Sequence, residues 1–165
     1  MTVVTADDLD TLTRQLGRPV RGVRSVAYRC GSGHPAVVET EPRLPDGTPF
    51  PTLYYLTCPG AVAAVSTLES RGVMKAMTEQ LDGDDELAAA YQRAHQDYLE
   101  RRGRIDHVDE IHGVSAGGMP TRVKCLHVLV AHSLAVGPGV NPFGDQALEL
   151  LRPAWDPRTC DWEPR

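Results

Sequence analysis

Cysteine and histidine are the residues of this chain best suited to chemistry, and four cysteines and six histidines are spread along it. No two cysteines have the Cys-x-x-Cys spacing of the strongest zinc motifs. A tetrahedral zinc site of sulfur and nitrogen ligands would therefore need residues from several segments. The candidate ligands are Cys30, His34, Cys58 and Cys125. The alternative is that each cysteine is a small buried hydrophobic residue, as free cysteines usually are.

A cysteine nucleophile is a second interpretation of the same residues. Cys58 stands directly before Pro59 at the predicted start of a helix. A thiol at that position has a lowered pKa, because the helix dipole stabilises the thiolate. With His34 or His127 as its base, Cys58 would be able to act catalytically, and we take Cys58 and His127 as the catalytic candidates. The alternative is that Cys58 fills a corner between a strand and a helix.

Glycine-rich turns provide a third candidate, an anion-binding site. Gly118 follows another glycine and precedes a predicted helix, where free backbone N–H groups attract phosphate or carboxylate. Arg122 and Lys124 lie within about one helical turn of it. A similar turn, Gly31-Ser32-Gly33, precedes His34. Neither glycine pair matches a nucleotide-binding motif, and both can equally be simple turns.

Three predicted strands would bring the first group of residues together. β-Branched and aromatic side chains predict strands over residues 23–28, 36–40 and 52–57. Short connections favour an antiparallel meander, in which the first and third strands end at the same edge of the sheet. Cys30 follows the first strand and Cys58 the third, so two thiols and His34 are expected at that edge.

A long apolar segment, residues 119–136, predicts a helix that is apolar on nearly every side and therefore buried at the centre of the fold. In a regular helix Cys125 and His127 point about 200° apart around the axis. The two side chains are then unable to bind the same ion. We therefore expect this helix to contribute one ligand at most.

Helices are predicted for most of the remaining chain. Thr5 and Asp8 form a capping box before a helix that ends at Gly17. Helical spacing of apolar residues predicts further helices over residues 59–72, 73–81, 85–102 and 146–151. We expect residues 1–151 to form a single domain and residues 152–165 to form a weakly ordered tail.

Length and composition exclude several classes of protein. A chain of 165 residues with 41% hydrophobic and 24% charged residues is typical of one soluble globular domain. Its formal charge of −5 argues against nucleic-acid binding, which needs a basic surface. No apolar run reaches the length of a membrane span, and the N-terminus lacks the pattern of a signal peptide. The sequence therefore predicts a cytoplasmic protein.

Several short motifs together resemble a bacterial family, common in actinobacteria, of uncharacterised proteins known as domain of unknown function 501. The motifs are Thr-Pro-Phe-Pro-Thr at residues 48–52, Gly-Gly-Met-Pro at 117–120, Lys-Cys-Leu-His at 124–127 and Asn-Pro at 141–142. The resemblance covers roughly residues 9–151. It implies no particular activity. Relatives often have a cysteine or a proline soon after the position of Cys30, so a ligand set in that loop would differ here.

These observations predict an α+β fold, with a small antiparallel three-stranded sheet packed against about five helices. The leading functional hypothesis is a binding or adaptor domain whose Cys/His cluster can bind zinc. The alternative is a small enzyme that uses a Cys58 thiolate and a nearby histidine on an anionic small molecule. A small anionic ligand or a protein is the expected partner.

Overall fold

The computed structural model describes residues 1–164, and over these residues the fold is α+β, as predicted. It has a four-stranded sheet rather than three strands, and six α-helices rather than about five. The elements are β1 (Thr2–Val3), α1 (Ala6–Leu16), β2 (Val23–Arg29), β3 (Pro35–Thr40), β4 (Tyr54–Leu56), α2 (Pro59–Glu69), α3 (Val73–Gly83), α4 (Asp85–Gly103), the 3-10 helix η1 (Asp109–Ile111), α5 (Leu126–Val136) and α6 (Pro142–Leu151).

The sheet is an antiparallel meander in the order β1-β2-β3-β4, which confirms the predicted topology of its three main strands. Val38 of β3 pairs with Val26 on one side and with Tyr55 on the other. Strands β2 and β4 therefore run in the same direction and end at the same edge. Both residues of the additional strand β1 are exposed, so no hydrophobic pattern could have predicted it.

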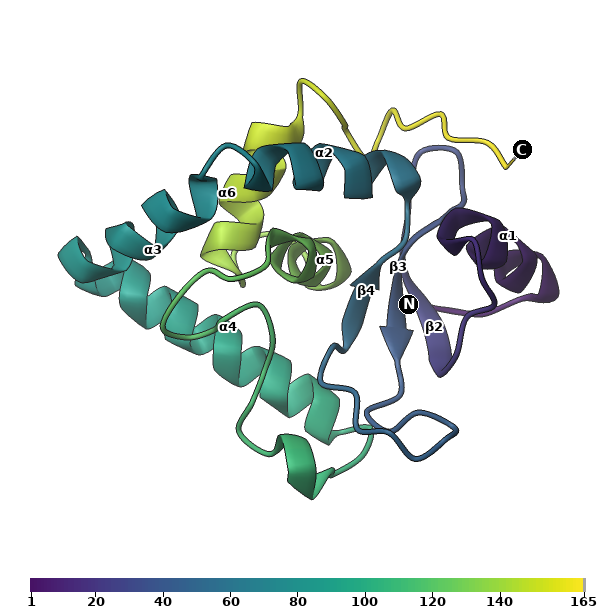
Figure 1. The fold of residues 1–165 in the computed structure, drawn as a ribbon, viewed down its shortest axis with the longest axis horizontal. Coiled ribbons are helices and arrows are strands. Elements are labelled where there is room, and N and C mark those ends of the chain that lie inside the picture. Colours follow the sequence, from purple (N-terminus) through teal and green to yellow (C-terminus); the bar gives the residue numbers. More distant parts are fainter. Residues whose placement is uncertain (165) are drawn as a thin grey trace.

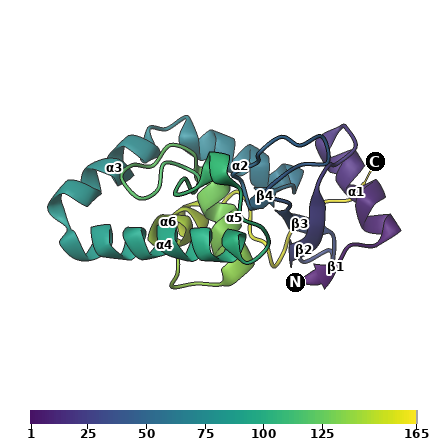
Figure 2. The same ribbon diagram turned by 90° about the horizontal axis from the view of Figure 1, so that it is seen from below.

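Helices cover both faces of the sheet (Figures 1 and 2). On one face α5 packs against β2, β3 and β4, and α2, α4 and α6 surround α5. Buried side chains such as Val37 and Tyr54 join this main core. On the other face lies α1, whose buried Leu12 accompanies the buried Val26 and Val38. Because α1 has only 11 residues, it covers this face incompletely.

The predicted capping box of α1 is present. The Thr5 hydroxyl accepts the Asp8 N–H at 3.1 Å, and the Asp8 carboxylate accepts the Thr5 N–H at 3.0 Å. Arg29 at the end of β2 donates to the same carboxylate at 2.7 Å, and this charged partner holds the Asp8 pKa well below its usual range. One carboxylate thus starts α1 and ties it to the sheet.

Helix α5 is buried at the centre of the fold, as predicted, but it begins at Leu126 and not near residue 119. The backbone before it makes turn and loop hydrogen bonds instead of helical ones. Lys124 N–H donates to the Gly117 carbonyl at 2.7 Å, and Val123 N–H donates to the Thr78 hydroxyl at 2.9 Å. Apolar side chains in this segment, such as Met119, are buried without being helical. The apolar pattern of residues 119–136 therefore predicted correctly that the segment is buried, and wrongly that all of it is helical.

A polar network inside the core joins α4, α5 and the start of α6. The side chain of Asn141 caps α6 by accepting the Gly144 N–H, so α6 starts at Pro142 and not at residue 146 as predicted. The Asn141 amide N–H₂ must then face His132 Nδ1, at 3.1 Å. His132 consequently donates from Nε2 to the Asp97 carboxylate at 2.9 Å. These two contacts fix the orientation of the His132 ring in a fully buried position.

The C-terminal segment after α6 runs back along the sheet edge where β2 and β4 end (Figure 1). Trp155 is buried in the main core, and the Pro157 carbonyl accepts the Gly31 N–H at 2.7 Å. Trp162 makes an edge contact with the His34 ring. Among the described residues, no helix is long and apolar enough to cross a membrane.

Candidate functional site

Three side chains that can bind a metal converge where α2 ends and α5 begins. Glu69 is the last residue of α2, Cys125 is the N-cap of α5 and His127 lies in the first turn of α5. One ligand atom from each lies within 4.8 Å of the other two. All three residues are half-buried, so solvent can reach the point between them.

The start of α5 is held by Glu69. The first N–H groups of a helix have no partner within the helix, and the positive end of the helix dipole favours an anion there. The Glu69 carboxylate supplies both needs, because its Oε1 accepts the Leu126 N–H at 2.8 Å. Cys125 has an extended backbone, with φ of −147° and ψ of 114°, and so its side chain lies outside the helical turn.

The contacts of His127 define the geometry of the site. Its Nδ1 lies 3.1 Å from Glu69 Oε1 and 3.9 Å from the Cys125 sulfur. Its other ring nitrogen, Nε2, lies 3.2 Å from the hydroxyl of Ser66, one turn before Glu69 on α2. The carboxylate and the thiol therefore share one ring nitrogen, while a hydroxyl binds the other.

Protonation of the site is shifted toward a thiolate and an imidazolium. Burial opposes ionisation of Cys125, but His127 and the backbone N–H of Val128 together lower the pKa of the thiol. The Cys125 contact raises the pKa of His127, burial opposes this, and the charge of Glu69 adds to the increase. An anionic sulfur is also the form that binds a metal ion.

Two of the three separations between the ligand atoms are close to those of a tetrahedral zinc site. Zinc bonds of about 2.0–2.1 Å to nitrogen or oxygen and about 2.3 Å to sulfur place neighbouring ligand atoms roughly 3.3–3.6 Å apart. The observed separations of 3.1 Å and 3.9 Å lie within a few tenths of an ångström of that range. The third separation, between the Glu69 carboxylate and the Cys125 sulfur, is within 4.8 Å.

Comparison with known proteins places the chain in a family. A family model described as "Protein of unknown function (DUF501)" matches residues 26–149, about three quarters of the chain. The chain belongs to the DUF501 family. No curated protein and no solved structure matches it. Glu69, Cys125 and His127 all lie inside the matched region of this DUF501 protein.

Cys58 lies at the start of α2, as predicted for this DUF501 chain, but its surroundings do not suit a nucleophile. It is 0% exposed, and its sulfur lies 3.6 Å from that of Cys160. Burial raises the pKa of Cys58 to about 11, and the neighbouring Cys160 thiol adds to the increase. These effects exceed those of the Gly60 and Ala61 N–H groups, which favour the thiolate.

Cys30 and His34 lie near the shared end of β2 and β4, as the meander requires, but they have other partners. The Cys30 sulfur contacts the Ser32 hydroxyl at 3.0 Å. His34 contacts Trp162 and lies 3.5 Å from the carboxylate of Glu163. Among residues 1–164, the metal-binding side chains that lie close together are Glu69, Cys125 and His127. Cys30, His34 and Cys58 do not belong to this group.

The predicted anion site also changes. Gly118 does not precede a helix directly, and its carbonyl accepts the N–H groups of Thr121 and Arg122 in a tight turn. A side chain on Gly118 would collide with the Arg122 carbonyl, 2.7 Å from the position of its first carbon. Gly118 is therefore required for the turn. Arg122 and Lys124 are exposed on the same loop.

Sequence reasoning missed two residues of the site, Glu69 and Ser66. Both stand on a mostly apolar helix, and Cys125 comes 56 positions after Glu69 in the chain. Ser66 and Glu69 are three residues apart and therefore lie on one face of α2. This spacing is the only sequence pattern that links the two residues. His127 was identified, but as a base for Cys58 rather than as a neighbour of Cys125.

Proposed function

We propose that this protein binds one zinc ion through Glu69, Cys125 and His127. One observation carries the proposal, namely that the carboxylate and the sulfur both approach the same ring nitrogen of His127. One donor atom from each of three different ligand types lies within 4.8 Å of the other two, and zinc would take the place of the proton on His127 Nδ1.

The same observation distinguishes a metal site from a catalytic triad. In a triad the nucleophile and the acid contact different nitrogens of the histidine, because one nitrogen takes the nucleophile's proton while the other keeps its N–H bonded to the acid. Here Nε2 is occupied by Ser66, which can accept its N–H. A hydrogen bond at one nitrogen that orients the other toward a metal is typical of histidine ligands.

Three protein ligands would leave the fourth position of the zinc ion open. Such a position takes water in catalytic sites and can also take a ligand from a small anion or a protein partner. Arg122 and Lys124, exposed on the loop that leads to Cys125, would favour an anion there. This supports a binding or adaptor role. The cytoplasm is the location we propose, because a thiol ligand needs a reducing compartment.

Elemental analysis of protein purified without a histidine tag tests the zinc site directly. We expect one zinc per chain, and a loss of affinity of about tenfold to hundredfold or more for Cys125→Ser, His127→Gln and Glu69→Gln. The matched control is Cys160→Ser, which removes a half-buried thiol outside the site and should keep the metal. Cobalt(II) should give a thiolate charge-transfer band that Cys125→Ser abolishes. Zinc that is absent, or that survives Cys125→Ser, would refute the proposal.

A second candidate function is a reactive thiol at Cys125. The observation that favours it is the lowered pKa of a half-exposed cysteine beside a histidine. In that case the purified protein contains no zinc, iodoacetamide modifies Cys125 first near neutral pH, and His127→Gln slows the modification. Stoichiometric zinc that protects Cys125 from iodoacetamide would exclude this candidate.

A further inference from the structure

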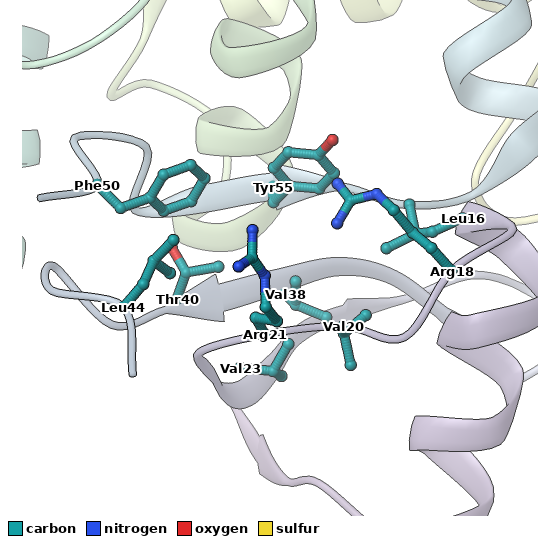
Figure 3. A pocket seen from close by; sticks show the side chains of 10 residues that line it. All are labelled: Leu16, Arg18, Val20, Arg21, Val23, Val38, Thr40, Leu44, Phe50 and Tyr55. Atoms are coloured by element: carbon teal, nitrogen blue, oxygen red, sulfur yellow. The ribbon is translucent and has the colours of Figure 1, made fainter. Parts of the chain in front are cut away.

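A pocket lies on the sheet face that α1 covers incompletely, separate from the Glu69–Cys125–His127 site. Figure 3 shows the residues that line it, which come from α1, three strands and the loops between them. The floor is apolar and includes Val38 on β3 and Val23 on β2. Phe50 and Leu44, from the loop between β3 and β4, form one end. The cavity volume is about 90 Å³, several times what one water molecule needs.

The charged residues of this pocket are all of one sign. Its ten lining residues include two arginines, Arg18 and Arg21, and no aspartate or glutamate. The whole chain has the opposite balance, with 22 acidic and 17 basic residues. Figure 3 shows both guanidinium groups turned toward the ring of Tyr55, which lines the pocket with them. Two cations that extend over an apolar floor favour an anion with an apolar body.

Both arginines are available to a ligand. Among the ion pairs of the described residues, Arg18 has none and Arg21 has one, to Asp46 at 3.3 Å. The side chains of that pair are 60% and 51% exposed, and such exposed pairs contribute little. Arg21 can therefore leave Asp46 for a carboxylate in the pocket, where a guanidinium binds both oxygens in a fork.

We infer that this pocket binds a small apolar carboxylate, with its ring or short chain on the floor that includes Val23 and Val38. Arg18 and Arg21 bind the carboxylate beside the ring of Tyr55. The cavity of about 90 Å³ limits the apolar part of the ligand to a single ring or a short chain. A bare anion such as phosphate gains nothing from the apolar floor.

Titration with benzoate, followed through amide chemical shifts of labelled protein, tests this inference. We expect saturable shifts that centre on Thr40 and Tyr55. Benzamide, which has the same shape without the charge, should bind at least about tenfold more weakly, since one charge-assisted hydrogen bond contributes that much. Inorganic phosphate at the same ionic strength should not displace benzoate.

Variants separate the pocket from general surface charge. Arg18→Gln and Arg21→Gln should each weaken benzoate about tenfold. The matched control is Arg24→Gln, which removes an exposed arginine of β2 that pairs with Glu39 and Glu41 outside the pocket. It should leave benzoate binding unchanged. Equal binding of benzoate and benzamide, equal effects of the three variants, displacement by phosphate, or no shifts at Thr40 and Tyr55 would each overturn the inference.

Discussion

Cys58 should be the slowest of the four cysteines to react with an alkylating agent, although its place at a helix start predicts the opposite. Burial and the Cys160 thiol raise its pKa from an ordinary 9.0 to about 11. At neutral pH that shift lowers the thiolate fraction about a hundredfold. A more basic thiolate is about tenfold more nucleophilic over the same shift, so a net slowing of about tenfold remains. Complete burial adds to it, because the reagent must wait for local opening.

The assay is a time course with iodoacetamide at pH 7 on protein treated with a chelator, read by mass spectrometry of cysteine peptides. In the native protein Cys125 should be modified first, because its pKa is lowered and its side chain is half-exposed. Cys58 should lag behind the same peptide in urea by at least about tenfold. The urea sample is the internal control, since all four thiols have similar reactivity there.

Replacement of Cys160 by serine tests the cause of the slowing. The pair contact that raises the pKa of Cys58 is then lost, while burial, the larger cause, remains. Cys58 in Cys160→Ser should therefore react somewhat faster than in the native chain and still more slowly than in urea. Modification of Cys58 before Cys125, or at its urea rate, would show that the environment of Cys58 has been misjudged.

Two further predictions concern stability. Arg102→Met should lower the free energy of unfolding, measured in urea, by about 3–5 kcal/mol, because the buried Arg102 side chain donates to three backbone carbonyls. Arg102→Lys should lose less of this free energy than Arg102→Met. Burial raises the pKa of Asp97, but hydrogen bonds from His132 and Arg101 outweigh burial and lower this pKa to about 2. The ionised Asp97 carboxylate therefore stabilises the fold by about 2 kcal/mol above pH 4, and this stabilisation is lost as the pH falls through 2. Asp97→Asn should remove that part of the pH dependence; an unchanged profile would contradict the assignment.

Local patterns in the sequence were sufficient for much of the fold. The capping box of Thr5 and Asp8 involves residues three apart, and the structure contains it. The antiparallel meander followed from short connections between strands of the expected composition. The predicted start of the last helix, residue 146, was wrong because Asn141 and not Asp145 is the N-cap, and its side chain accepts the Gly144 N–H. Both residues are good caps, and only the packing of Asn141 against His132 decides between them.

The candidate site was harder to predict because one boundary controls its geometry. If α5 began near residue 119, Cys125 and His127 would lie inside a regular helix and point about 200° apart. The backbone N–H groups of Val123 and Lys124 bond elsewhere, so the helix starts at Leu126. Cys125 is then extended, and its sulfur reaches the same ring nitrogen as Glu69. A shift of the helix start by seven residues therefore turns two incompatible ligands into neighbours.

The contact of Glu69 with the start of α5 also explains why Glu69 belongs to the site. A free helix start needs an acceptor, and Glu69 meets that need through the Leu126 N–H whether or not a metal is bound. The hydrogen bond to Leu126 thus holds Glu69 Oε1 at 3.1 Å from His127 Nδ1 before any metal binds. Preorganisation of this kind lowers the cost of ligand binding. Glu69→Gln keeps an acceptor for Leu126 and removes the charge, so it separates the role in folding from the role in binding zinc.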